Sequence, residues 1–252
     1  MLDKIMVRKA IGQDVLVDPN YSPDKAVLGY SDSGSPESRS LAVVFPAWRL
    51  HLNDRYYRAL GWCLGLQGFA VRRYDFNDHI LEPDVDQVVA SYKNIRETVT
   101  EELETFADQR RFNRIHFIAS SLGTVSMALV ASSFDRMTSA TIASGSSNLA
   151  LSVWHGIRTR EVRRALEEAE EGCTARMVDD KWHDIAPMTH ASAFENKPTR
   201  MIISTTDAII PTIFQREMAD ALADAGSQVS THDTTLGHYA SIGAYFAVGR
   251  LP

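Results

Sequence analysis

Short apolar runs alternate along the chain with longer stretches in which apolar residues recur every third or fourth position. The short runs predict strands buried on both faces, because a strand with one face in water would alternate apolar and polar residues. The longer stretches predict amphipathic helices that cover a sheet. The predicted strands are residues 15–18, 26–32, 41–45, 69–76, 114–120, 139–145, 199–205 and 227–233, the first two as antiparallel edge strands. The predicted helices are residues 54–68, 84–108, 123–133 and 212–226.

The order of these elements predicts an α/β protein with a mainly parallel, twisted sheet and helices on both faces. One segment breaks the alternation. Residues 147–196 hold two helical patterns, near 149–158 and 160–171, and a loop rich in Trp, His and Met. Roughly 50 residues is long for a crossover between two strands. We therefore expect a single domain over residues 1–252 with a small helical cap inserted at about 147–196.

The composition limits the classes of binding partner and the cellular compartment that we expect. Of the 252 residues, 44% are hydrophobic and 23% are charged, which is ordinary for a globular protein. The net charge is −6 and the isoelectric point is near 5.7, and no basic stripe is visible, so no nucleic-acid partner is expected. The two cysteines, Cys63 and Cys173, fit a reducing cytoplasm better than a disulfide framework.

The sequence also lacks targeting and membrane signals. Residues 1–15 are too polar for a signal peptide. No window approaches the ~18 uninterrupted apolar residues that a membrane span requires. We therefore expect a cytoplasmic protein without integral membrane association, and the sequence leaves its oligomeric state open.

The stretch IHFIASSLGT, residues 115–124, contains two adjacent serines at the end of a predicted strand. The nucleophile elbow of α/β-hydrolases has a small residue two before and two after its serine, because the tight strand-to-helix turn packs these positions together. The register centred on Ser121 places Ala119 and Gly123 there, whereas the register centred on Ser120 would place bulky side chains there. Ser121 is therefore the predicted nucleophile. The alternative, a small-residue turn without catalytic function, stays open at this point.

An acid and a base follow Ser121 in the order expected for such an enzyme. Asp207 comes directly after a predicted strand, and His238 lies between the last predicted strand and an apolar helical pattern at 239–249. In this fold the triad runs serine, acid, histidine along the chain, and the acid orients the histidine that acts as the base. His232 is the competing base, but it lies within a predicted strand. Asp207 could instead cap a helix, and a lone histidine could be a packing residue.

Acyl transfer also needs backbone donors for the oxyanion. Leu122 N–H follows the nucleophile directly, and Trp48 N–H is expected from the loop after strand 41–45, where Pro46 has no N–H to donate. Apolar side chains of the cap either pack the core or line an acyl pocket. Together with the oxyanion loop they give the candidate pocket residues Ala47, Trp154, Met177, Trp182 and Met188. No residue spacing predicts a metal site, and no cofactor is expected.

Residues 40–246 resemble the acyl-acyl-carrier-protein thioesterase of luminous bacteria, the acyltransferase subunit of their fatty-acid reductase. The resemblance rests on the elbow that begins with Ala119 and on the stretches GFAVRRYDFNDH, TIASGSSNLALSVWHGI and DDKWHDI, which start at residues 68, 141 and 179. It implies the α/β-hydrolase fold, the same triad, and an enzyme that takes an acyl group from a thioester onto Ser121. Two features depart from that family: Gly123, where the family has another small residue, and the sequence of the oxyanion loop.

These features favour a serine hydrolase that works through an acyl-enzyme, most simply a thioesterase acting on an acyl carrier protein or CoA thioester. Two alternatives use the same residues: a carboxylesterase or lactonase on an oxygen ester, and an acyltransferase to an acceptor other than water. A haloperoxidase-like or lyase use of the triad is a further alternative. From another class, the chain could be a binding module without activity. The intact set of serine, acid and histidine argues against that last alternative, because an inactive scaffold has no need of all three.

Overall fold

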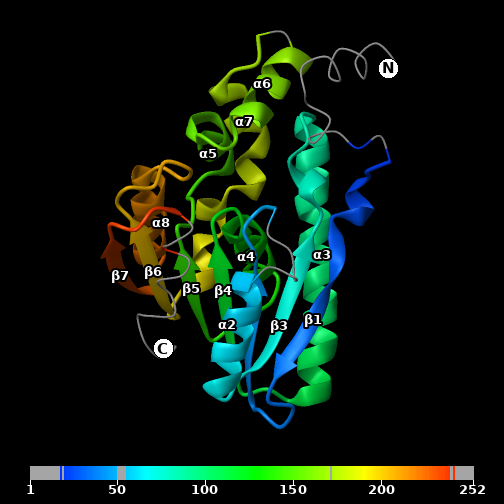
Figure 1. The fold of residues 1–252 in the computed structure, drawn as a ribbon, viewed down its shortest axis with the longest axis vertical. Helices are drawn as coiled ribbons and strands as arrows, with labels where there is room; N and C mark the ends of the chain where they lie inside the picture. Colours follow the sequence, from blue (N-terminus) through cyan, green and yellow to red (C-terminus); the bar gives the residue numbers. More distant parts are fainter. Residues whose placement is uncertain (1–17, 19, 50–54, 171, 239–240, 242–252) are drawn as a thin grey trace.

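A computed structural model describes residues 18, 20–49, 55–170, 172–238 and 241, and its centre is a single sheet (Figure 1). The strands are β1 (Val27–Gly34), β2 (Ser40–Phe45), β3 (Ala70–Phe76), β4 (Arg114–Ser120), β5 (Ser139–Ala143), β6 (Pro198–Ser204) and β7 (Gln228–Thr234). Their order in the sheet is β1-β3-β2-β4-β5-β6-β7. β1 is antiparallel to β3, and every other pair of neighbours is parallel.

The central strands are apolar on both faces because both faces are covered. In β2, Leu41, Val43 and Phe45 belong to one buried cluster, while Ala42 and Val44 belong to a second cluster on the opposite face. The edge strands β1 and β7 differ, since all of their residues are at least partly exposed. Continuous apolar runs in the sequence therefore mark the strands that lie between two layers of helices.

Helices cover the two faces of the sheet unequally. The helices outside the segment between β5 and β6 are η1 (Pro23–Lys25), α2 (Arg55–Leu66), η2 (Asp78–Leu81), α3 (Val85–Arg110), α4 (Gly123–Ala131) and α8 (Thr212–Asp224). Apolar residues of α2 pack on one face, and those of α3, α4 and α8 pack on the other. Every residue of α4 is buried, so close packing on all sides fixes its N-terminus at the end of β4.

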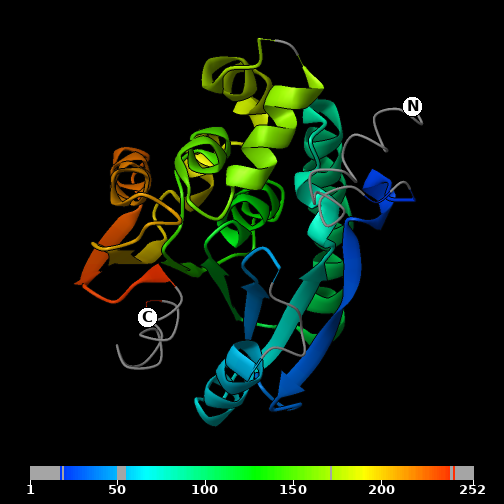
Figure 2. The same ribbon diagram turned by 45° about the horizontal axis from the view of Figure 1, so that its top comes forward.

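A helical segment fills the stretch between β5 and β6. It consists of α5 (Leu149–His155), α6 (Arg160–Ala169), α7 (Ala175–Trp182), η3 (His183–Ile185) and η4 (Pro187–Phe194). In both Figure 1 and Figure 2, α5, α6 and α7 gather beyond the end of the sheet toward which the parallel strands point. The Trp182 indole Nε1–H donates to the Val85 carbonyl at 3.0 Å, which ties this segment to the start of α3.

The predicted class, an α/β protein with a mainly parallel sheet and helices on both faces, is confirmed. Each strand predicted from residue 26 onward begins and ends within two residues of the observed one, whereas the strand predicted at 15–18 lies, apart from residue 18, outside the described residues. Helix α7 was expected to be loop. The single domain over residues 1–252 and the limits of the cap at 147–196 stay predictions. The helix predicted at 239–249 lies, apart from residue 241, outside the described residues, and none of the described helices is long and apolar enough to cross a membrane.

Candidate active site

Ser121 occupies the turn between β4 and α4. Its φ is 54°, in the left-handed region that residues with a Cβ avoid. Two backbone hydrogen bonds hold the turn: Ser121 N–H donates to the Ala143 carbonyl at 3.0 Å, and Thr124 N–H donates to the Ser121 carbonyl at 3.1 Å. A strained serine between a buried strand and a buried helix has the geometry of a nucleophile elbow.

The glycine two residues after Ser121 is required by a close approach of two backbone segments. A Cβ on Gly123 would lie 2.4 Å from the carbonyl oxygens of both Phe45 and Pro46. Any side chain there would push α4 away from the end of β2. The small residue on the other side of the turn, Ala119, is also buried. The small residues of the motif therefore bring the serine turn against the loop that starts at Pro46.

Ser120 lies in a different environment from its neighbour. Its Oγ is 2.7 Å from the hydroxyl of Tyr57 on α2, and this hydroxyl accepts the N–H of Ala47, also at 2.7 Å. Both Tyr57 and Ser120 are buried. The resulting chain of hydrogen bonds links the end of β4 to the loop after β2. Tyr57 was missed from the sequence because its partners are 10 and 63 residues away and meet it only in the folded chain.

Asp207 and His238 form a buried hydrogen-bonded pair. Asp207 Oδ2 lies 2.7 Å from His238 Nδ1, and the Asp207 side chain is 0% exposed. The other oxygen, Oδ1, accepts the N–H groups of Ile209 and Ile210 at 2.8 and 3.0 Å. Asp207 therefore stabilises the turn before α8 and contacts the predicted base at the same time.

Further hydrogen bonds hold this pair in place. Gln215 Nε2 donates to Asp207 Oδ2 at 3.1 Å, and Gln215 Oε1 accepts the N–H of Ser204 at 2.9 Å. On the histidine side, the Ser241 hydroxyl donates to the His238 carbonyl at 2.7 Å. The acid and the base are thus each fixed by a second polar residue, and neither Gln215 nor Ser241 was identified from the sequence.

The parallel sheet brings the three predicted catalytic residues to the same end, the one at which the parallel strands terminate. Ser121 follows β4, Asp207 follows β6 and His238 follows β7. The carboxyl ends of parallel strands face the same way, and α/β proteins bind their ligands there. The competing base, His232, lies in the middle of β7 with an exposed side chain. It is therefore a residue of the edge strand rather than of the loop that follows it.

The two predicted oxyanion donors lie on either side of the close approach at Gly123. Leu122 precedes α4 directly, and Trp48 lies in the loop after β2. The N–H of Ala47, which precedes Trp48 in that loop, donates to the Tyr57 hydroxyl. Within the described residues, neither Leu122 N–H nor Trp48 N–H has an acceptor in the protein. Both remain candidates for binding an oxyanion.

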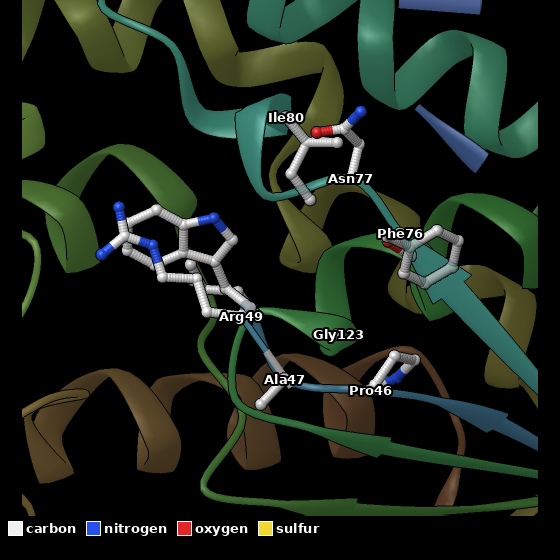
Figure 3. Close-up of a pocket in the computed structure, with 10 residues that line it drawn as sticks. Pro46, Ala47, Arg49, Phe76, Asn77, Ile80 and Gly123 are labelled. Carbon is white, nitrogen blue, oxygen red and sulfur yellow. The ribbon is translucent and has the colours of Figure 1, made fainter. Parts of the chain in front are cut away.

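A small pocket lies beside these donors (Figure 3). Figure 3 shows Ala47 and Arg49 along one side of it and Phe76, Asn77 and Ile80 along the other. The Trp48 indole also lines the pocket, where its Nε1–H donates to the Asp78 carbonyl at 2.7 Å. The full lining is Pro46, Ala47, Trp48, Arg49, Phe76, Asn77, Ile80, Leu122, Gly123 and Ser126. Ala47 is the one predicted pocket residue among them.

The other four predicted pocket residues, Trp154, Met177, Trp182 and Met188, do not line this small pocket. Trp182 is 1% exposed and packs in the core, which is the other of the two roles that its sequence pattern allowed. Trp154 and Met177 are partly buried, and Met188 is 43% exposed. Apolar residues that pack a cap and those that line a cavity have the same spacing, so the sequence could not separate them. Among the described residues, no group of three or more His, Cys, Asp or Glu could hold a metal ion.

We compared the chain with known protein families, curated proteins and solved structures. No family model matches the sequence, and no curated protein matches it either. Among solved structures, an acylaminoacyl peptidase of Pyrococcus horikoshii matches with a TM-score of 0.65 and 14% identity, over 85% of this chain and 36% of its own. A Pyrococcus furiosus esterase matches with 0.63 and 15%, over 91% and 90% of the two chains. The chain has the α/β-hydrolase fold. An acetyl xylan esterase from Paenibacillus sp. R4 also matches, with 0.63 and 16%, over 87% and 78%.

The turn at Ser121 has the geometry of a nucleophile elbow, and Asp207 and His238 follow it in chain order. Identities of 14 to 16% mean that the likeness concerns the fold alone. The chain spans 36% of the peptidase, so only part of that protein corresponds to it. What the chain catalyses must therefore be argued from its own residues.

Proposed function

We propose that the chain is a serine hydrolase that forms an acyl-enzyme on Ser121, and that its substrate is an acyl thioester. The observation that supports this most is the strained turn at Ser121 together with the buried Asp207–His238 pair at 2.7 Å. A positive φ at a serine is unfavourable, and such strain clusters at functional sites. A binding module without activity would need neither the strain nor the pair.

In the proposed reaction, the Nδ1–H of His238 donates a hydrogen bond to the Asp207 carboxylate. This leaves Nε2 of the same ring without a proton, so that it can act as the base. Nε2 takes the proton of the Ser121 hydroxyl as Oγ attacks the thioester carbonyl carbon. The N–H groups of Leu122 and Trp48 stabilise the oxyanion that forms. The C–S bond then breaks, and the sulfur leaves as a thiol with the proton from His238.

Water completes the cycle by the same steps in reverse. His238 removes a proton from a water molecule, whose oxygen attacks the acyl carbon of the ester on Ser121. The tetrahedral intermediate again places its negative oxygen at the backbone donors. The bond to Ser121 Oγ then breaks, the serine recovers its proton from His238, and a carboxylic acid is released. An alcohol or amine in place of water would make the enzyme an acyltransferase.

Two observations bear on the substrate. The first is the motif resemblance of residues 40–246 to acyl-carrier-protein thioesterases, which favours a thioester carried by an acyl carrier protein or CoA. The second candidate is an oxygen ester, because two of the structural neighbours are an esterase and an acetyl xylan esterase.

A fluorophosphonate probe tests the nucleophile, because it reacts covalently with activated serines. Intact-protein mass spectrometry is expected to show one added probe on the wild type and on Ser120→Ala, and none on Ser121→Ala. Ser120→Ala is the matched control because it removes the neighbouring hydroxyl. Labelling that persists in Ser121→Ala would contradict the proposal.

The base is tested by two histidine variants. His238→Ala is expected to lower kcat by about 10⁶-fold, the size of effect that follows removal of the histidine of a triad. His232→Ala removes an exposed histidine of the edge strand and is expected to keep most of the activity. The opposite pattern in steady-state kinetics would move the base to His232.

Matched substrates separate the two candidate reactions. The specificity constant kcat/KM is measured for a butyryl thioester of pantetheine and for the oxygen ester of the same acyl group. We expect the thioester to be the better substrate. A preference for the oxygen ester above about tenfold, or 1.4 kcal/mol in transition-state stabilisation, would favour the esterase instead.

A further inference from the structure

Ser144 comes directly after β5 and has a φ of 49°, in the left-handed region that a residue with a Cβ avoids. The residue is completely buried, and its N–H donates to the Ile202 carbonyl of β6 at 2.9 Å. Glycine takes this backbone conformation at little cost, yet the chain places its glycine one position later, at Gly145. The serine at position 144 therefore keeps a strain that a glycine would relieve.

The hydroxyl of Ser144 reaches the segment that carries the predicted base. Ser144 Oγ lies 2.5 Å from Ser241 Oγ, and both serines are buried. The Ser241 hydroxyl donates to the His238 carbonyl at 2.7 Å. Because a serine hydroxyl has one proton to donate, Ser241 must accept the hydrogen bond that Ser144 donates. A directed chain of hydrogen bonds thus runs from the end of β5 to the backbone of His238.

The loop around His238 is attached to the sheet at more than one point. Ser241 N–H donates to the Gly237 carbonyl at 2.9 Å, so Ser241 binds the carbonyls on both sides of His238. The Ser204 hydroxyl at the end of β6 donates to the Leu236 carbonyl just before them. The ends of two neighbouring strands, β5 and β6, therefore limit how far His238 can move.

The same end of β5 also holds the predicted nucleophile. Ser121 N–H donates to the Ala143 carbonyl at 3.0 Å. Ala143 and Ser144 are joined by one peptide bond, so a single rigid point of the sheet contacts the turn of Ser121 and the segment of His238. Proton transfer needs its donor and acceptor within about 2.6–3.2 Å of each other. A contact that fixes both segments at one point therefore bears on the rate of that transfer.

We propose that Ser144 is a positioning residue whose hydroxyl, acting through Ser241, holds His238 within reach of Ser121. The inference deepens the proposed function and rests on it, because it concerns the base of that reaction. Ser144 acts on the backbone of His238 and not on the substrate. The strain at its φ is retained because glycine, the unstrained residue for this position, has no hydroxyl.

Ser144→Gly separates this role from a structural one, because it removes the hydroxyl and relieves the strain at the same time. The two effects on stability oppose each other, so its Tm is expected to stay within about 4 °C of the wild type. On the better of the two butyryl substrates, kcat is expected to fall roughly 10- to 100-fold, the cost of a small displacement of a catalytic group. KM is expected to change by less than about threefold, since substrate binding is not affected.

The matched control is Ser146→Ala, which removes another fully buried hydroxyl two residues further along the chain. The Ser146 hydroxyl donates to the Asn148 carbonyl at 2.8 Å and contacts the Ser152 hydroxyl at 2.5 Å, both in the helical segment after β5. This variant is expected to keep the kcat of the wild type. A Ser144→Gly enzyme that also keeps it would overturn the inference.

A double variant tests whether Ser144 acts through Ser241. Ser241→Ala already breaks the bond from its hydroxyl to His238, so adding Ser144→Gly is expected to lower kcat by less than about threefold more. Losses that multiply in the double variant would show two independent effects and would overturn the proposed chain of bonds. The assignment of Ser121 and His238 would be unaffected by either result.

The position of His238 can also be tested without turnover. Its buried Nδ1–H is bound to Asp207 at 2.7 Å and is therefore protected from exchange with water. In Ser144→Gly, proton NMR is expected to show exchange at least about tenfold faster than in the wild type. Trp182 Nε1–H, bound to the Val85 carbonyl, is the internal reference and is expected to exchange equally in both proteins. Equal exchange at His238 would overturn the inference alone, whereas a wild type that hydrolyses neither butyryl substrate would contradict the proposed function.

Discussion

Ser120 and Ser121 are adjacent in the chain, yet they differ in backbone conformation and in the groups that their side chains contact. Ser121 lies on a turn with a φ of 54°. Ser120 still belongs to β4, and its hydroxyl is bound to Tyr57, which in turn holds Ala47 N–H. Because Ala47 precedes Trp48, this chain of bonds orients the loop that carries a proposed oxyanion donor. At the scale of single residues, the second serine therefore supports the first one indirectly.

Tyr57→Phe removes the hydroxyl in the middle of this chain and leaves the buried Ala47 N–H without its acceptor. We expect kcat to fall by roughly tenfold, less than the 10²–10³-fold that follows the loss of a whole oxyanion donor. KM should change less than kcat, because the donors act mainly on the transition state.

The control for this prediction is Ser120→Ala, which breaks one bond of the chain but keeps the Tyr57 contact to Ala47. Its loss of kcat should be smaller than that of Tyr57→Phe. Thermal unfolding of both variants checks that the fold is intact. A Tyr57→Phe enzyme with the kcat of the wild type would show that this hydroxyl does not position the loop.

At the scale of elements, the site depends on how closely β2 and α4 approach each other. Gly123 permits this approach, because the position of its absent Cβ lies 2.4 Å from two carbonyl oxygens. Those oxygens belong to the backbone and cannot rotate away as a side chain could. The spacing between the start of α4 and the loop after β2 is therefore set by one residue without a side chain.

Gly123→Ala is expected to lower the free energy of unfolding by about 1–3 kcal/mol, the usual cost of overpacking a buried site. The matched control is Gly61→Ala on α2, where the nearest atom to the new Cβ is the movable Ser33 hydroxyl at 3.2 Å. That control should gain up to about 1 kcal/mol from the better helix propensity of alanine. Urea unfolding measures both, and a Gly123→Ala variant as stable as the wild type would refute the steric argument.

The elements were predictable to different degrees for physical reasons. Buried strands carry continuous apolar runs, so their limits follow from the sequence. The register of Ser121 also follows, because crowding at Ala119 and Gly123 is local. Helix α7 was not predictable, since it has only eight residues, Ala175–Trp182, after its N-cap Thr174. Short helices depend on packing more than on propensity.

The supporting residues of the site could not be predicted either. Tyr57 and Gln215 carry no motif, and their roles come from contacts between segments that are distant in the chain. Sequence spacing identifies groups that act on a substrate when a turn fixes their geometry. It does not identify the groups that hold those residues in place.

At the scale of the whole molecule, one buried histidine links stability to pH. His116 of β4 is 0% exposed, and its ring nitrogens lie 2.7 Å from Ser139 Oγ and 3.0 Å from Thr141 Oγ1. Burial, and then the charges of Arg114 and Arg200, lower its pKa from 6.5 to about 3. The unfolded chain therefore binds this proton below pH 6.5, whereas the folded protein does not until about pH 3.

Stability is accordingly expected to fall as the pH is lowered through this window, by at most about 1.4 kcal/mol per pH unit from His116. His116→Gln removes the titrating group. Between about pH 7 and pH 5.5 its free energy of unfolding should therefore decrease by roughly 1 kcal/mol less than that of the wild type. His232→Gln, at an exposed histidine, should follow the wild type. Equal pH dependence of His116→Gln and the wild type in urea unfolding would refute this linkage.

The place of β7 at the edge of the sheet has a consequence for biosynthesis. A ribosome releases the chain from its N-terminus, so Ser121, the cap and Asp207 all emerge before His238. Among the described strands β7 pairs with β6 alone, and it must add to the sheet after β6 to bring His238 to Asp207. Under the proposed mechanism, a nascent chain cannot hydrolyse a thioester until β7 has docked. The first turnover of each molecule would then report that this strand is in place.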